Sequence, residues 1–173
     1  MNQTLRFPAE WEAQSGVLIA WPTADTDWAD RLGQVEETYI ALVAAITRFQ
    51  PVLICVADDD VETYAEMRLR SNRIDMDKVH FTTAAYDDTW LRDSGPITLR
   101  RADGGFQLLD FRFTGWGGKF DATLDDQLVG VLDQAGVFND APVRSIPFAL
   151  EGGGIETDGE GTLLTTWKCL FPS

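Results

Sequence analysis

Short apolar runs alternate with amphipathic stretches along this chain of 173 residues, and this alternation predicts an α/β fold. Apolar runs bounded by turn residues are typical of buried strands. We expect such strands at 15–22, 51–56, 78–83 and 141–148. Two further runs are joined by the turn ADGG and predict a hairpin, 96–100 with 106–113. The last segment most simply forms a second hairpin that turns at Asp158-Gly159.

Three amphipathic stretches predict helices between these strands. The first carries apolar residues at three- and four-residue steps until Pro51 ends the pattern. Its predicted apolar stripe consists of Leu32, Val35, Tyr39, Leu42, Val43, Ile46 and Phe49. A second helix is expected at 57–71, which begins with acidic and ends with basic residues, and a third at 124–137, which Gly136 ends.

A weak internal repeat in the sequence suggests how these elements are grouped. Segments 42–54 and 128–146 both place an apolar helix stripe before a strand that begins with proline. This repeat indicates two copies of one αβ unit, although two matching fragments could also arise by chance. No linker or low-complexity segment separates the copies, so we expect one compact domain over 1–173.

Composition and charge narrow the class of protein. The hydrophobic content of 45% is enough for one core, whereas 173 residues are too few to expect two independent domains. The net charge of −14 disfavours binding to nucleic acid or to anionic membranes and favours cationic ligands, or it serves solubility alone. Cys55 lies within an apolar run, where a thiol is usually buried, so the two cysteines do not suggest a disulfide framework. The sequence shows neither a leader peptide nor an apolar segment long enough to span a membrane. We therefore expect a cytoplasmic protein.

The stretch DDTWLRDSGP, 87–96, combines acids with an indole in a way that suits the wall of a polar pocket. A planar cation such as guanidinium could lie over Trp90 and donate a forked pair of hydrogen bonds to Asp93. Alternatively, Arg92 or another basic residue forms a structural ion pair with Asp93. The local sequence leaves both interpretations open.

Glu151 is the second candidate, because three glycines follow it and let the backbone approach another segment closely. A carboxylate that is partly desolvated in this way has a raised pKa and can transfer protons. The alternative is a surface glutamate in a glycine-rich hairpin. The acids at 58–60 are more typical of a solvated helix start. Because His80 is the only histidine, and sits in a strand pattern, we expect no metal site and no cofactor.

Four ordered motifs, spread over most of the chain, resemble the agmatine deiminase and bacterial-type peptidylarginine deiminase family. They are FPAEWEAQSGVLIAWP, DDTWLRDSGP, FTGWGGKF and EGGGIETDGEGTLLTT. The family belongs to the guanidine-modifying superfamily, so the resemblance implies a partial α/β propeller of the pentein type, built from ββαβ units. We expect one unit at about 1–85, another at about 86–148 and the start of a third from 149.

The resemblance also implies roles for individual residues. Trp90 and Asp93 would hold the substrate guanidinium, and Glu151 would both bind it and take part in catalytic proton transfer. We also expect Trp116, in the FTGWGGKF motif, to contact the substrate. The implied reaction hydrolyses a guanidinium group to a ureido group and ammonia, through a cysteine nucleophile and a histidine acid and base. With agmatine as substrate, this reaction leads toward putrescine and the polyamines.

The sequence departs from the family pattern in its later part. The family's G-H-x-D motif and late catalytic cysteine have no counterpart here, His80 cannot be mapped onto the catalytic histidine, and Cys169 matches a non-catalytic position. We therefore expect this chain alone to be inactive. The alternatives are a non-catalytic guanidinium-binding module and a fragment that self-assembles through its truncated face. The sequence does not separate agmatine from free or peptidyl arginine.

Overall fold

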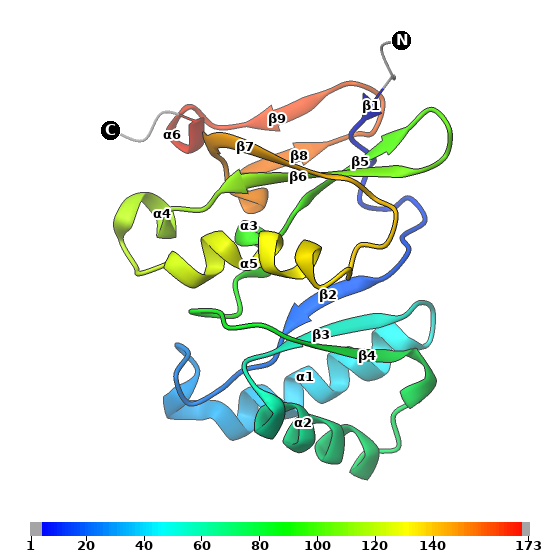
Figure 1. Ribbon diagram of the computed structural model, residues 1–173, viewed down its shortest axis with the longest axis vertical. Coiled ribbons are helices and arrows are strands. Elements are labelled where there is room, and N and C mark those ends of the chain that lie inside the picture. Colours follow the sequence, from blue (N-terminus) through cyan, green and yellow to red (C-terminus); the bar gives the residue numbers. More distant parts are fainter. Residues whose placement is uncertain (1–4, 171–173) are drawn as a thin grey trace. The chain divides into compact units, whose positions relative to one another are not determined.

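The computed structural model describes residues 5–170 and divides into two compact units, which share no sheet (Figure 1). One unit is Gln14–Leu91, and the other combines Met1–Ala13 with Arg92–Ser173. Helices and strands are mixed throughout both units, which confirms the predicted α/β class. No helix within residues 5–170 is both long enough and apolar enough to cross a bilayer.

The unit Gln14–Leu91 contains a three-stranded parallel sheet in the order β2-β3-β4. Its strands are β2 (Val17–Ala20), β3 (Val52–Val56) and β4 (Val79–Thr83), and its helices are η1 (Ala29–Arg31), α1 (Leu32–Thr47), α2 (Asp59–Ser71) and η2 (Met76–Lys78). Helices α1 and α2 cover one face of the sheet (Figure 1). The core between these layers is apolar, since Ile54 and Leu69 are fully buried there.

Helix α2 begins where the acidic start of its sequence predicts. The Asp58 side chain accepts a hydrogen bond from the backbone N–H of Val61 at 2.8 Å, which caps the helix. Arg68 and Arg70 lie in the last turn, where cations interact favourably with the helix dipole. The acids at 58–60 are exposed, as expected for a solvated helix start.

The buried face of α1 differs from the predicted stripe. Leu42 is 42% exposed and Phe49 is 80% exposed, whereas Val43 is buried as predicted and Ile40, which the predicted stripe left out, is buried as well. The buried line of the helix also includes Glu36, which forms an ion pair with Arg68 of α2. Hydrophobicity alone did not indicate this rotation, because a partnered charge occupies a position on the packed face.

The second unit contains a four-stranded sheet in the order β1-β5-β6-β7 and a separate two-stranded sheet, β8-β9. The strands are β1 (Leu5–Arg6), β5 (Ile97–Arg101), β6 (Phe106–Arg112), β7 (Val143–Ala149), β8 (Ile155–Thr157) and β9 (Leu163–Thr165). Both predicted hairpins are present, since β5 pairs antiparallel with β6 and β8 pairs antiparallel with β9. Helix α5 (Thr123–Gln134) connects β6 to the parallel strand β7.

The succession β5-β6-α5-β7 has the order ββαβ, whereas the strands and main helices of the unit Gln14–Leu91 follow the order β2-α1-β3-α2-β4. The propeller-like repetition of one unit therefore stays a prediction. Four short helical turns complete the described chain, namely α3 (Leu91–Ser94), α4 (Gly115–Gly118), η3 (Gly152–Gly154) and α6 (Trp167–Leu170). Two of them, α3 and η3, carry or adjoin the candidate site.

Candidate functional site

Asp93 lies in the turn α3, and its carboxylate faces the glycine run at 152–154. The Asp93 Oδ1 atom accepts a hydrogen bond from the backbone N–H of Gly153 at 2.9 Å. The neighbouring Arg92 does not neutralise it, because Arg92 forms ion pairs with Glu10 and, at 3.8 Å, with Glu156. No ion pair of Asp93 occurs among residues 5–170. The alternative in which Arg92 serves as the structural partner of Asp93 is therefore wrong.

Glu151 follows β7 and directly precedes the turn η3. Partial burial raises the pKa of its carboxyl above the ordinary value, and the negative charge of Asp93 raises it further. Within the described residues, the Glu151 carboxylate forms neither a hydrogen bond nor an ion pair. Two neighbouring carboxylates thus lack a cationic partner among residues 5–170, and a bound cation would stabilise the ionised form of both.

The glycine run allows this pair to form. A Cβ atom at Gly152 would overlap the carbonyl oxygen of Arg92, and one at Gly153 would overlap the Asp93 carboxylate. Residues with a side chain at these positions would push Glu151 away from α3. The glycines therefore permit a close approach of two backbone segments, as the sequence indicates.

Trp90 belongs to the other unit, Gln14–Leu91, where it packs against a second indole. Its ring centroid lies 5.7 Å from that of Trp28, at an interplanar angle of 42°. Trp28 is held in place because its Nε1–H donates to the Thr89 hydroxyl at 2.7 Å. The sequence pattern did not indicate Trp28 as a neighbour of Trp90, although Trp28 also lies between acidic residues. The approach of Trp90 to the carboxylate pair stays a prediction.

Trp116 lies in the glycine-rich turn α4 and packs edge-on against Phe113 and Phe120, with ring centroids 5.3 Å and 5.6 Å away. Its backbone adopts φ of 58°, a left-handed conformation that is rare for a bulky residue. The side chain remains 36% exposed. A contact between Trp116 and a substrate also stays a prediction.

The remaining candidates lie outside this carboxylate pair. His80 is exposed on β4, and Cys55 is fully buried in β3. Cys169 lies beside Gly154, and its sulfur accepts a hydrogen bond from the Thr166 hydroxyl at 3.0 Å. No group of three His, Cys, Asp or Glu residues that could hold a metal ion occurs in the part of the chain that the structure describes.

Comparison with known proteins shows which family this chain resembles. Agmatine deiminases from Stutzerimonas stutzeri and Ectopseudomonas mendocina are 33% and 35% identical to the chain over 170 and 172 residues, which is 95% of this chain and 44% of each relative. The chain thus spans less than half the length of these curated relatives.

Solved structures are similar as well. An agmatine deiminase from C. jejuni with substrate bound superposes with a TM-score of 0.86 at 28% identity, covering 99% of this chain and 48% of that one. An agmatine deiminase of Enterococcus faecalis gives a TM-score of 0.82 at 27% identity, covering 96% and 44%. The sequence profile of the Porphyromonas-type peptidyl-arginine deiminases matches residues 6–173. Because this match extends over nearly the whole chain, the chain belongs to the Porphyromonas-type peptidyl-arginine deiminase family.

Proposed function

We propose that this chain carries guanidinium-binding residues of a deiminase that converts a guanidinium group to a ureido group and ammonia. The family membership supports this proposal, as do the relatives named agmatine deiminase. Agmatine, or an arginine-like molecule with the same head group, is the substrate class. If agmatine is the substrate, the reaction supplies polyamine synthesis.

The observation that carries the proposal is the pair Asp93 and Glu151, which lacks a cationic partner among residues 5–170. A guanidinium is planar, permanently charged and equipped with several N–H donors, so it can bond both carboxylates at once. The negative net charge of −14 attracts such cations toward the protein.

Each proposed residue has a separate task. Asp93, fixed by the Gly153 N–H, accepts hydrogen bonds from the guanidinium. Glu151 accepts as well, and its raised pKa suits a group that takes up and returns a proton during the reaction. Trp90 and Trp116 offer aromatic faces, which attract a planar cation.

Binding of agmatine to the intact chain, measured by isothermal titration calorimetry, tests this proposal. We expect a Kd in the millimolar range, equivalent to about −4 kcal/mol. Asp93→Asn and Glu151→Gln should each weaken binding about tenfold or more, because each removes a charged hydrogen-bond acceptor. Glu160→Gln is the matched control, since Glu160 is an exposed acid of the same unit and should bind agmatine as the original chain does. Equal affinities in all variants would overturn the proposal.

We further propose that these 173 residues do not turn over agmatine by themselves. The family reaction needs a cysteine thiolate and a histidine acid and base. His80 is exposed on β4, and Cys169 lies in the short turn α6 with its sulfur bonded to Thr166. Incubation with agmatine should release no ammonia above the rate of a Cys169→Ala control. Ammonia release that Cys169→Ala abolishes would instead make Cys169 the nucleophile.

A non-catalytic binding module is the rival to this function. Such a module would have to bind its guanidinium ligand more tightly than the millimolar Kd expected above. Micromolar agmatine binding that is lost in Asp93→Asn, with no ammonia released, would favour that rival.

A further inference from the structure

The N-terminal segment 5–13, here called the strap, contacts the turn α3, which carries Asp93, and the β8-β9 hairpin, which follows Glu151 in the chain. It begins as β1, whose Leu5 and Arg6 pair with Arg101 and Arg100 of β5. Its other end is held by Arg100, whose guanidinium donates to the Ala13 carbonyl at 3.0 Å. The strap is therefore fixed at both ends to one strand.

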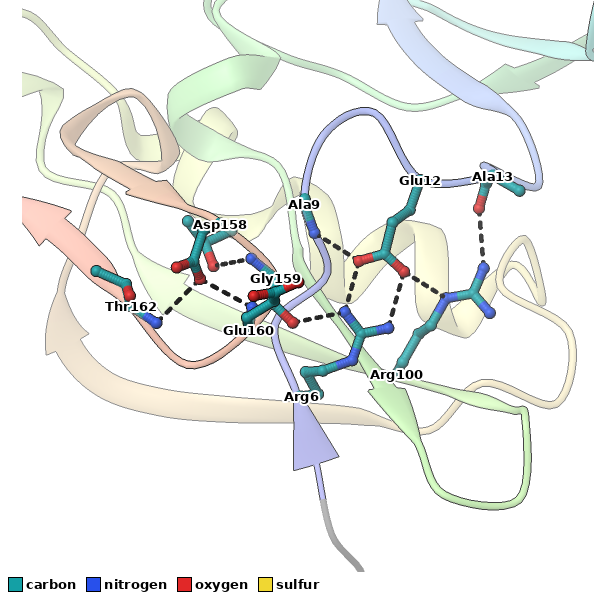
Figure 2. A network of polar contacts seen from close by, with 10 residues as sticks. Arg6, Ala9, Glu12, Ala13, Arg100, Asp158, Gly159, Glu160 and Thr162 are labelled. Atoms are coloured by element: carbon teal, nitrogen blue, oxygen red, sulfur yellow. Dashed lines mark hydrogen bonds and ion pairs between the residues drawn. The ribbon is translucent and has the colours of Figure 1, made fainter.

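Glu12 closes the strap on itself (Figure 2). Its carboxylate accepts a forked pair of hydrogen bonds from Arg6, at 2.5 Å and 2.8 Å, and a third from the backbone N–H of Ala9 at 2.8 Å. Arg100 lies 3.9 Å from the same carboxylate. The hydrogen bonds from Arg6 and Ala9 lower the pKa of Glu12 to about 2. Bidentate arginine–carboxylate pairs fix geometry as well as charge, so Glu12 sets the course of the strap.

Arg6 also connects the strap to the β8-β9 hairpin. Its guanidinium donates to the Gly159 carbonyl at 2.8 Å, as Figure 2 shows. Gly159 has φ of 75°, and a Cβ atom there would lie 2.8 Å from the Ala9 nitrogen. The hairpin turn thus packs tightly against the strap. Because β8 directly follows the glycine run after Glu151, this contact restrains the segment that carries Glu151.

Glu10 connects the strap to the other half of the pair. It forms an ion pair with Arg92, the residue that precedes Asp93 in α3. Arg92 also lies 3.8 Å from Glu156 of β8. One guanidinium therefore joins the strap, the turn that carries Asp93 and the strand that follows Glu151.

We infer that the strap sets the spacing between Asp93 and Glu151, with Glu10 and Glu12 as positioning residues that never touch the substrate. The importance of this spacing for guanidinium binding rests on the proposed function. Exposed ion pairs contribute little to folding stability, so a purely structural role predicts only small changes in unfolding. A positioning role predicts that the electrostatic environment of Glu151 changes when the strap is loosened.

The test is an NMR pH titration of the Glu151 carboxyl carbon in the intact, ligand-free chain, compared with Glu12→Gln and Glu10→Gln. We expect the pKa of Glu151 to fall toward the ordinary value of 4.5 in both variants, because Asp93 moves away and water enters. Glu66→Gln is the matched control, since it removes an exposed ion pair with Arg70 in α2 and should leave the pKa unchanged.

An unchanged pKa of Glu151 in folded Glu10→Gln and Glu12→Gln would overturn the inference. If Glu12→Gln does not fold, the pKa of Glu151 in Glu10→Gln is sufficient for the test, because this variant keeps the paired hydrogen bonds between Arg6 and Glu12. The measurement contains no agmatine, so it is separate from the binding test. A chain that binds no agmatine can still show the pKa change, and a chain that binds agmatine can still lack it.

Discussion

At the scale of single residues, the main feature is a pair of acids that repel each other. Partial burial and the charge of Asp93 both disfavour the ionised form of Glu151, and Arg92, the residue before Asp93, forms an ion pair with Glu10 instead. Because the folded state binds the proton of Glu151 more tightly than the unfolded state does, the ionised residue destabilises the fold above its raised pKa. This cost disappears below the ordinary value of 4.5. A cationic ligand would offset the cost.

This electrostatic arrangement predicts that agmatine binding depends on pH. The agmatine guanidinium stays charged at all relevant pH values, so the titrating partner is Glu151. As the pH falls through the raised pKa of Glu151, the carboxylate becomes neutral and affinity should fall. Calorimetry at a series of pH values measures this dependence. The Glu151→Gln variant should show a flatter profile, and a profile identical to that of the original chain would contradict the prediction.

At the scale of secondary-structure elements, the close approach of η3 to α3 depends on glycine. We expect Gly152→Ala to destabilise the fold by about 1–3 kcal/mol, because its Cβ would overlap the Arg92 carbonyl oxygen. Gly130→Ala is the control, since no atom within 4 Å would meet a Cβ there and the substitution favours helix α5 by about 0.5–1 kcal/mol. Urea unfolding measures both. The same sign for both changes would contradict this account of the glycine run.

Local patterns predicted the elements well but not every packed face. The strands after β1, the main helices and both hairpins follow from apolar runs, caps and turn residues, whereas the two-residue strand β1 was not predicted. The rotation of α1 did not follow, since the buried Glu36 is compatible with the core only through Arg68, on another helix. Such a partner is distant in sequence and leaves no periodic signal.

In the candidate site as well, neighbouring residues in the sequence indicated some features, whereas contacts between distant residues could not be predicted. The composition of 87–96 and the glycines after Glu151 pointed to the two carboxylates, which the fold brings together. The strap contacts of Glu10 and Glu12 were missed. Glu10 forms an ion pair with Arg92, and Glu12 holds Arg6, which donates to Gly159; both Arg92 and Gly159 lie far from the strap in sequence. The run FPAEWEA contains both acids, but nothing local distinguishes them from solvated side chains.

At the scale of the whole molecule, the apolar side chains of β9 and α6 predict self-association. Leu163, Leu164 and Trp167 are 53%, 66% and 74% exposed, and exposed apolar side chains promote contact between copies. β9 is also an edge strand of the two-stranded sheet. We propose a second copy of the chain as the occupant of this surface.

Light scattering at micromolar to millimolar concentration checks this proposal. The chain should scatter as a dimer or larger species, and the double variant Leu163→Ser with Leu164→Ser should scatter as a monomer. Phe49→Ser provides the control, because Phe49 is 80% exposed in the other unit and should leave the association unchanged. A monomer over the whole concentration range would contradict the proposal.

The most direct test of the central claim is the pKa of the Glu151 carboxyl, followed by NMR with and without saturating agmatine. If the guanidinium lies between Asp93 and Glu151, its positive charge favours the ionised carboxylate, and the pKa of Glu151 should fall on binding. The analogue of agmatine in which a neutral ureido group replaces the guanidinium should leave it unchanged. A pKa that stays the same or rises with agmatine bound would contradict the claim that these two acids receive the guanidinium.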